Sequence, residues 1–273
     1  MFFSKVIRQI FRPDLINNFK SFLGLSVEDP NFEFKRISKL GRFKNGETDL
    51  IHNGFRFLDS ESFINQFHDI YRRELLRFSS SIKNPLILDC GSNIGVSVCY
   101  FKKIYPDSRI IAFEPDQKIF STLKHNTQNF NSSNLKLHNS AVWTENTNLR
   151  FISNGADGGK IGHNGDQSVD AQKLSNFLSN RVNMLKIDIE GAEKFVLPSI
   201  AEYLKNVEYL FLELHIDKNE PELLEQTCQL LRANRFRYKI DSVGLVNFSS
   251  FENQDEHAMQ LNILAVNDNF RNI

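Results

Sequence analysis

Short apolar runs alternate with helical stretches from Pro85 onward, and this alternation constrains the fold more than any other feature of the sequence. The apolar runs have strand length and lie at residues 86–90, 109–113, 135–142, 184–189 and 207–214. Stretches with helical periodicity lie at residues 95–104, 117–129, 191–205 and 220–233. Strands that alternate with helices form a mostly parallel sheet, because each connecting helix packs on one of its faces. The sequence therefore predicts an α/β fold with helices on both faces of the sheet.

The two ends of the chain and one internal segment depart from this alternation. Strand candidates at 243–248 and 260–266 follow each other directly and predict a C-terminal antiparallel hairpin at the sheet edge. The Gly- and Asn-rich residues 154–168 predict a mobile surface loop. Apolar spacings of three and four before residue 80 predict a small, mainly helical segment. We therefore divide the chain into an N-terminal helical extension, residues 1–80, and an α/β domain, residues 81–273.

Composition narrows the functional classes. The 33 basic and 33 acidic side chains leave no net charge, which argues against a nucleic-acid partner. No apolar run approaches the roughly 18 residues that span a bilayer. The amphipathic, basic residues 1–25 allow weak peripheral membrane contact, although we favour a packing helix or a dimer contact there. Cys90, Cys99 and Cys228 fit no disulfide framework, so we expect reduced thiols and a cytoplasmic protein. These features leave the oligomeric state open.

The strongest chemical signal is the turn after the first strand, in LILDCGSNIGVSVCYF. Asp89 closes the strand, Gly91 and Gly95 bracket a tight turn, and Asn93 lies between them. The helix that follows points unpaired backbone N–H groups into the same crevice, where a polar ligand group can bind. A dinucleotide fingerprint needs a third glycine where Val96 stands, so the spacing excludes an NAD-dependent oxidoreductase.

The next two strands end in residues suited to a nucleoside. Glu114 closes the strand in RIIAFEPD, and its carboxylate can accept hydrogen bonds from both hydroxyls of a ribose. Pro115 then turns the chain, and Asp116 can cap the following helix. The third strand ends in Ser140 and Ala141, whose small side chains would leave space for an adenine ring.

Rows of polar side chains mark the fourth and fifth strands. Strand alternation would place Lys186, Asp188 and Glu190 on one face, and Glu213 and His215 in a similar row on the neighbouring strand. Charged side chains on a buried sheet are usually paired or functional. A purely structural interpretation pairs Lys186 with Glu213, but it leaves Asp188 and His215 without a role.

Two chemical interpretations remain open for this row. Asp188, Glu213 and His215 can together bind a divalent metal ion, because two carboxylates and an imidazole are competent ligands. In the metal-free alternative, His215 accepts a proton from a substrate and a carboxylate orients its ring. We favour the metal-free arrangement, because the ammonium of Lys186 would repel a cation, and we assign no metal ligand.

Several of these strings resemble the FkbM-family methyltransferases. LILDCGSNIG, IIAFEPD, NSAV, LSNFL, MLKIDIEGAE and LFLELH occur in the order and spacing of that family, closely over residues 60–215 and loosely over the terminal hairpin. Ser92 and Ser140 depart from it, since alanine is common at both positions. The resemblance implies a Rossmann-like sheet of seven strands and transfer of a methyl group from S-adenosylmethionine to an oxygen. Residues 81–273 would then form the methyltransferase domain.

The resemblance also implies roles for individual residues. The cofactor would be held by Asp89, Gly91, Asn93, Gly95, Glu114, Pro115, Ser140, Ala141 and Asp188. Asp188 would also lie beside the reacting methyl group, with His215 or Glu190 as the base. We expect a small-molecule or glycan acceptor, such as a sugar, a polysaccharide precursor or a secondary metabolite, contacted by the N-terminal extension. The alternative is a non-catalytic methyltransferase-like binding module, against which the retained turn glycines and Glu114 argue.

Overall fold

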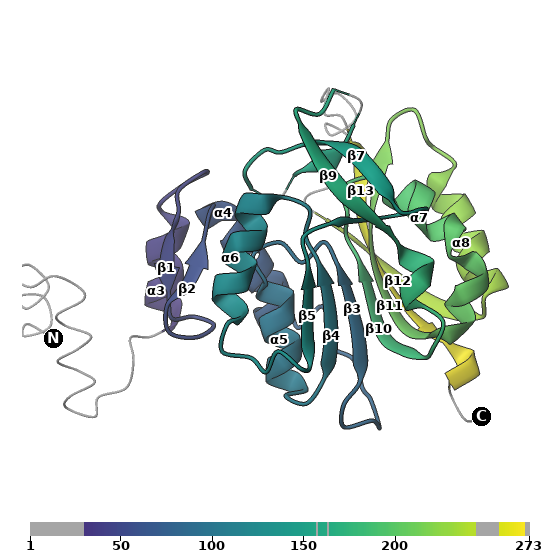
Figure 1. The fold of residues 1–273 in the computed structure, drawn as a ribbon, viewed down its shortest axis with the longest axis horizontal. Helices are drawn as coiled ribbons and strands as arrows, with labels where there is room; N and C mark the ends of the chain where they lie inside the picture. Colours follow the sequence, from purple (N-terminus) through teal and green to yellow (C-terminus); the bar gives the residue numbers. More distant parts are fainter. Residues whose placement is uncertain (1–29, 157, 163, 244–256, 271–273) are drawn as a thin grey trace, which may run out of the picture.

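The centre of the protein is a sheet of seven strands, seen in a computed structural model that describes residues 30–156, 158–162, 164–243 and 257–270 (Figure 1). The strand order is β12-β13-β11-β10-β3-β4-β5. These strands are β3 Leu86–Cys90, β4 Arg109–Phe113, β5 Leu135–His138, β10 Val182–Ile187, β11 Val207–Asp217, β12 Phe236–Ser242 and β13 His257–Asn267. Only β13 runs antiparallel to its neighbours within this sheet. The predicted Rossmann-like, mostly parallel sheet is confirmed.

The predicted C-terminal antiparallel hairpin is present, and its first strand begins earlier than predicted. β12 covers residues 236–242, whereas a strand was predicted at 243–248; of that range, residues 244–248 lie outside the described residues. β13 pairs with both β11 and β12, so that β12 forms the sheet edge. Within β12 only Phe236 is buried. An edge strand that exposes most of its side chains carries little apolar signal, which explains why residues 236–242 were not predicted as a strand.

Helices cover both faces of the sheet, and alternate strand residues supply the two cores. Figure 1 shows α5 and α6 on one side of the sheet and α7 and α8 on the other. These helices are α5 Val96–Ile104, α6 Gln117–Thr127, α7 Glu193–Ser199 and α8 Leu223–Ala233. Met184 and Phe211 join the core beneath α5, whereas Leu185 and Leu212 join the core beneath α7. The helix predicted at 191–205 is divided into α7 and a 3₁₀ segment, Ala201–Asn206.

A second, four-stranded sheet lies beside one end of the main sheet (Figure 1). It consists of β6 Ala141–Trp143, β7 Thr147–Ile152, β8 Lys160–Ile161 and β9 Gln167–Lys173 in the order β6-β9-β7-β8. The strand predicted at 135–142 is therefore two strands in different sheets, and the loop predicted at 154–168 contains β8 and the start of β9. Phe151, Val169 and Ala171 form a small apolar cluster in this sheet. The apolar pattern was too short to predict it.

The described part of the N-terminal extension packs directly on the α5 side of the sheet. It contains α3 Pro30–Ser38, β1 Gly46–Thr48, β2 Phe55–Phe57, α4 Ser60–Phe67 and a π-helical turn, His68–Arg72. Phe55, Phe57 and Phe63 are fully buried or nearly so and share one core with Ile87 and Tyr100. The extension thus adds a β-ribbon to its helices, and its division from the rest at residue 80 stays a prediction.

The helices predicted within residues 1–25 lie outside the described residues. Among the residues that are described, no helix is both long enough and apolar enough to cross a membrane. Cys90, Cys99 and Cys228 are free thiols, and the first two are buried.

Candidate active site

The main cavity lies at the carboxyl ends of β3, β4 and β10, where the chain winds toward opposite edges of the sheet on either side of the β3–β10 pair. Open α/β sheets bind ligands at such a switch point. Among the predicted site residues, this cavity is lined by Gly91, Asn93, Glu114, Pro115, Ser140, Ala141, Asp188 and Glu190. Asp89, Gly95 and His215 do not line it.

The turn at Gly91 follows β3 and contacts the ends of two neighbouring strands, β4 and β10. The N–H groups of Gly91 and Ser92 donate to the carbonyl of Phe113 at the end of β4, over 3.1 Å and 2.9 Å. Gly91 has φ +87°, and a Cβ atom there would lie 1.8 Å from the carbonyl oxygen of Asp188. The close approach of the two loops therefore requires glycine at this position.

Asp89 and Gly95 support the turn from behind. Asp89 is fully buried, and its Oδ2 accepts a hydrogen bond from the hydroxyl of Ser97 in α5, at 2.5 Å. Gly95 begins α5 with φ +92°, and a Cβ atom there would lie 2.8 Å from a methyl group of Leu123 in α6. These two residues fix the position of the helix rather than face the cavity.

Glu114 forms a rigid carboxylate wall at the end of β4. Its Oε1 accepts the N–H of Asp116 at 2.8 Å, and its Oε2 accepts the N–H of Asn93 at 3.1 Å. Burial, with a contribution from the charge of Asp116, raises the pKa of Glu114 to about 8. Asp116 caps α6 as predicted, by accepting from the N–H groups of Lys118 and Ile119.

The opposite wall carries small and apolar side chains. Ser140 and Ala141 line it together with Phe113 and Val142. The side-chain amide of Gln172 in β9 donates to the hydroxyl of Ser140 at 2.8 Å, so the second sheet fixes this wall. An apolar slot beside a carboxylate has the chemistry that a nucleoside requires.

Lys186 is a buried cation at the base of the main cavity. Its Nζ donates to the carbonyl of Gly91 at 2.9 Å and to Asp188 Oδ2 at 3.2 Å, and lies 3.5 Å from Asp89 Oδ1. Burial alone would lower its pKa, but the charges of Asp188 and Asp89 outweigh that effect and raise it. The predicted ion pair with Glu213 is not formed, because the carboxylates on the neighbouring β3 and after β10 lie closer.

The strand predicted to carry Lys186, Asp188 and Glu190 on one face is shorter in the structure. β10 stops at Ile187, so Asp188 and Glu190 lie in the turn before α7. Glu190 has φ 56°, in the left-handed region that non-glycine residues seldom adopt. This turn aims Glu190 at the main cavity and also at His215, whose Nε2 lies 3.4 Å from Glu190 Oε2.

His215 is a buried imidazole surrounded by carboxylates. Its Nδ1 lies 3.3 Å from Glu193 Oε1 and its Nε2 lies 3.9 Å from Glu213 Oε1. Burial alone would lower the pKa of His215, but the hydrogen bond to Glu193 and the charges of Glu193, Glu190 and Asp188 raise it to about 10. Without a cation at Nε2, the ring therefore holds its proton more tightly than a free imidazole does, which argues against the predicted role of His215 as a base.

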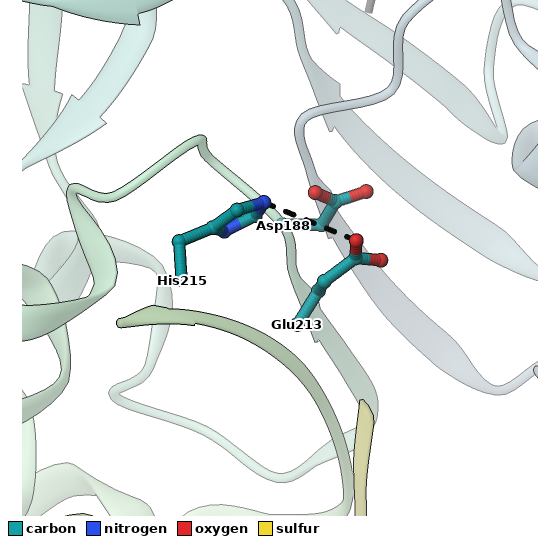
Figure 2. A group of neighbouring side chains, drawn as sticks. All are labelled: Asp188, Glu213 and His215. Carbon is teal, nitrogen blue, oxygen red and sulfur yellow. Dashed lines mark ion pairs between the residues drawn. The ribbon is translucent and has the colours of Figure 1, made fainter. Parts of the chain in front are cut away.

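Figure 2 shows Asp188, from the turn after β10, close to Glu213 and His215 from β11. One ligand-type atom from each of the three lies within 4.8 Å of the others. Burial, followed by repulsion from Asp188, raises the pKa of both Glu190 and Glu213 to about 8. The site thus gathers more buried carboxylates than basic groups.

A second cavity adjoins the main one and shares Gln66, Ile70, Lys186, Asp188 and Glu190 with it. Further polar residues of its lining are Asn65 and Asp69 from the N-terminal extension, Glu213 from β11, and Gln260 and Asn262 from β13. Sequence reasoning did not identify the amide residues of this cavity. For Asn262, the only sequence signal is its position opposite Glu213. That position can be recognised only when the β11–β13 register, which pairs the two residues, is known.

Residues 89–238 match the sequence profile of a family described as the methyltransferase FkbM domain, and this range contains the turn, Glu114, Asp188 and His215. The chain belongs to the FkbM methyltransferase family. The FkbM match begins at Asp89, and the walls that α4 and β13 give to the second cavity lie outside it.

Two curated relatives and one solved structure accompany this FkbM assignment. Methyltransferase 1 of Beauveria bassiana (strain ARSEF 2860) is 30% identical over 170 residues, 52% of this chain and 65% of that protein. Methyltransferase sdnD of Sordaria araneosa is 34% identical over 71 residues, 26% of this chain and 24% of that protein. The methyltransferase FkbM structure from Methylobacillus flagellatus KT is 16% identical with a TM-score of 0.47, covering 85% of this chain and 58% of that one. The chain spans less than two thirds of each.

Proposed function

We propose that this FkbM-family protein transfers a methyl group from S-adenosylmethionine to a hydroxyl oxygen of a small-molecule or glycan acceptor. The observation that carries the proposal is a main cavity lined by Glu114 and by small and apolar side chains, which joins a second, polar cavity at Asp188 and Glu190. When bound, S-adenosylmethionine supplies an electrophilic methyl group on its sulfonium. The protein must then align donor and acceptor, which accounts for much of the rate in such reactions.

The residues that line the main cavity offer the hydrogen-bond acceptor and the apolar contacts that the cofactor requires. Each oxygen of Glu114 accepts one backbone N–H and keeps a second lone pair, so the carboxylate can still accept the ribose hydroxyls. Ser140, Ala141 and Val142 offer an apolar slot for the adenine ring. Asp188 lies at the junction with the second cavity, on the side from which an acceptor would approach.

The second cavity fits a neutral acceptor rich in hydroxyl groups. Asn65, Gln66 and Gln260 present amides, which donate and accept hydrogen bonds without a charge. Glu190 lines both cavities and is the carboxylate that can take the proton of an acceptor hydroxyl. We place His215 behind it as a positioning residue. A sugar unit, including one of a polysaccharide precursor, and a hydroxylated secondary metabolite both have this chemistry. The proposal includes a cytoplasmic location, which the free thiols of Cys90, Cys99 and Cys228 support.

Titration calorimetry with S-adenosylmethionine and its demethylated product tests the cofactor assignment without a known acceptor. At about pH 9, where Glu114 is largely ionised, we expect Glu114→Gln to weaken binding about 10- to 100-fold, because hydrogen bonds to a charged partner contribute about 1.5–3 kcal/mol. Glu202→Gln, at an exposed position in the 3₁₀ segment after α7, is the control and leaves affinity unchanged. Equal affinities in both variants, or a preference for NAD, would refute the proposal.

A further inference from the structure

We propose that Asp188, Glu213, His215 and Asn262 form a binding site for a divalent cation of the Mn²⁺ class at the wall of the second cavity. Imidazole and carboxylate ligands together suit a first-row ion of this kind. This inference takes up the alternative that the sequence left open, and four features of the site support it.

The first feature is the convergence of ligand atoms. One atom each from Asp188, Glu213 and His215 lies within 4.8 Å of the other two, and Figure 2 shows the three side chains pointing toward one another. Ligand oxygens on opposite sides of a bound divalent ion are about 4–5 Å apart, because each lies about 2.0–2.6 Å from the metal. The three side chains can therefore reach one ion with small rotations.

The second feature is the orientation of the imidazole. Glu193 is fully buried and accepts the N–H groups of Ile189 at 2.8 Å and Gly191 at 2.9 Å. The same carboxylate lies 3.3 Å from His215 Nδ1, so Nε2 faces Glu213 and Glu190. A cation bound at Nε2 would displace the proton from that nitrogen, while Nδ1 keeps its N–H toward Glu193. Metal-binding histidines almost always have such a carboxylate or carbonyl on the other ring nitrogen.

The third feature is an unsatisfied oxygen next to the cluster. Asn262 lies directly opposite Glu213 in the β11–β13 register, so both side chains project from the same face of the sheet into the second cavity. Asn262 is only 3% exposed, and its Oδ1 has no hydrogen-bond partner within the described ranges of the chain. A buried carbonyl oxygen without a partner is costly, and a cation would satisfy it.

The fourth feature is local charge. The carboxylates of Asp188, Glu190, Glu193 and Glu213 gather around the single imidazole of His215. Lys186 offsets only part of this charge, because its ammonium is shared between Asp89 and one oxygen of Asp188. The ion pairs of Lys186 thus weaken the repulsion between its ammonium and a bound cation, on which the preference for a metal-free site rested.

The role of the ion rests on the proposed function. At this wall a divalent cation would contact an acceptor hydroxyl beside Glu190 and lower the pKa of that hydroxyl, which eases removal of its proton. The ion would thereby assist the carboxylate in making the acceptor oxygen nucleophilic.

Calorimetric titration of Mn²⁺ into chelator-treated full-length protein tests the site without requiring turnover. We expect one bound ion per chain and at least a tenfold weaker affinity in Glu213→Gln, which keeps the shape of the side chain but loses the charge. Asn262→Leu removes the amide oxygen at similar volume and is expected to weaken binding about three- to tenfold. The matched control is Glu208→Gln, a buried glutamate near the start of the same strand that pairs with Arg181; its Mn²⁺ affinity stays at the wild-type value.

Absence of Mn²⁺ binding at millimolar concentration, or equal affinity in wild type, Glu213→Gln and Asn262→Leu, would overturn the site. Circular dichroism of each variant establishes that it is folded before titration, and Asn262→Leu covers the case in which Glu213→Gln is not. S-adenosylmethionine is titrated into the same samples. Mn²⁺ binding without cofactor binding would support the metal site and refute the proposed function. Cofactor binding without Mn²⁺ binding would refute the metal site and support the proposed function.

Discussion

The two cavities that meet at Asp188 and Glu190 are built in different ways. The main cavity is shaped by backbone turns that follow consecutive strands, and its key groups bind each other's backbone, as Glu114 does with Asn93. The second cavity is shaped by side chains from α4, β11 and β13, which are far apart in the sequence. One cavity is therefore fixed by local chain geometry, and the other by how distant elements pack.

This difference separates two tasks within one fold. A change to the main cavity alters hydrogen bonds that hold strand ends together, so its shape tolerates little variation. Gln66 and Gln260 in the second cavity lie outside the matched FkbM range, and among the described residues no hydrogen bond of the main sheet involves their side chains. Under the proposed function, substitution there would change the acceptor while the cofactor wall is preserved, because function depends on the site and not on the fold alone.

The largest expected effect tests whether the wall of the second cavity is part of the main fold. Phe63 in α4 is fully buried, with its ring 5.3 Å from that of Phe57 and 5.7 Å from that of Phe55. We expect Phe63→Ala to lower the free energy of unfolding by about 3–5 kcal/mol, as for other buried aromatic residues, in one cooperative urea transition. Phe43→Ala, at a position that is 62% exposed, is the control and costs less than about 1 kcal/mol. Two separate transitions, with only the first affected by Phe63→Ala, would show that the N-terminal extension folds apart from the sheet.

The main cavity was largely predictable because its signals are local. Gly91 and Glu114 each follow an apolar strand, and parallel strands bring such positions to one edge. Sequence spacing did not distinguish the residues that line the main cavity from those behind it. Asp89 and Gly95 belong to the same motif as Gly91, but Asp89 contacts α5 and Gly95 packs against α6. That distinction depends on side-chain packing between helices, which a single motif does not encode.

The second cavity was not predictable for a physical reason. Its amides come from segments far apart in the sequence, whose contact depends on how α4 packs and how β11 and β13 pair, and β12 was not predicted as a strand. The raised pKa of His215 was missed for a similar reason, because the carboxylate that contacts its ring belongs to Glu193 in α7. Packing between elements that are distant in the sequence decides both features.

The next effect contrasts two glycines with similar backbone and different surroundings. At Gly91 a Cβ atom would lie 1.8 Å from the Asp188 carbonyl, whereas at Gly54, with φ +74°, nothing lies within 4 Å. A left-handed non-glycine residue costs about 1–2 kcal/mol, and overpacking adds about 1–3 kcal/mol. We therefore expect Gly91→Ala to lose about 2–5 kcal/mol of unfolding free energy in urea, and Gly54→Ala about 1–2 kcal/mol. Equal losses would mean that the loops at the main cavity can separate, and that its shape is less rigid than the contacts imply.

The smallest effect is a pH dependence confined to the main cavity. The pKa of Glu114 in the folded protein is about 8, raised mainly by burial above its ordinary value of 4.5. The folded protein therefore holds this proton more tightly than the unfolded chain. Without ligand, the corresponding stability is present below about pH 4.5 and is lost as the pH rises to about 8. Ribose hydroxyls favour the ionised carboxylate, so cofactor affinity should change in the opposite direction and strengthen as the pH rises through 8.

We expect S-adenosylmethionine to bind about tenfold more tightly at about pH 9 than at about pH 6, the lower end of what charged hydrogen bonds contribute, since a neutral carboxyl group keeps some hydrogen bonding. Calorimetry at both pH values measures this ratio directly. In Glu114→Gln the dependence should fall to that of the ligand itself and of Glu190, which also lines the main cavity with a pKa raised to about 8, because the amide at position 114 cannot ionise. A wild-type ratio equal to that of Glu114→Gln would mean that Glu114 stays ionised at both pH values, held so by the N–H groups of Asn93 and Asp116. The charge of the Glu114 carboxylate would then be determined more by its backbone hydrogen bonds than by its burial.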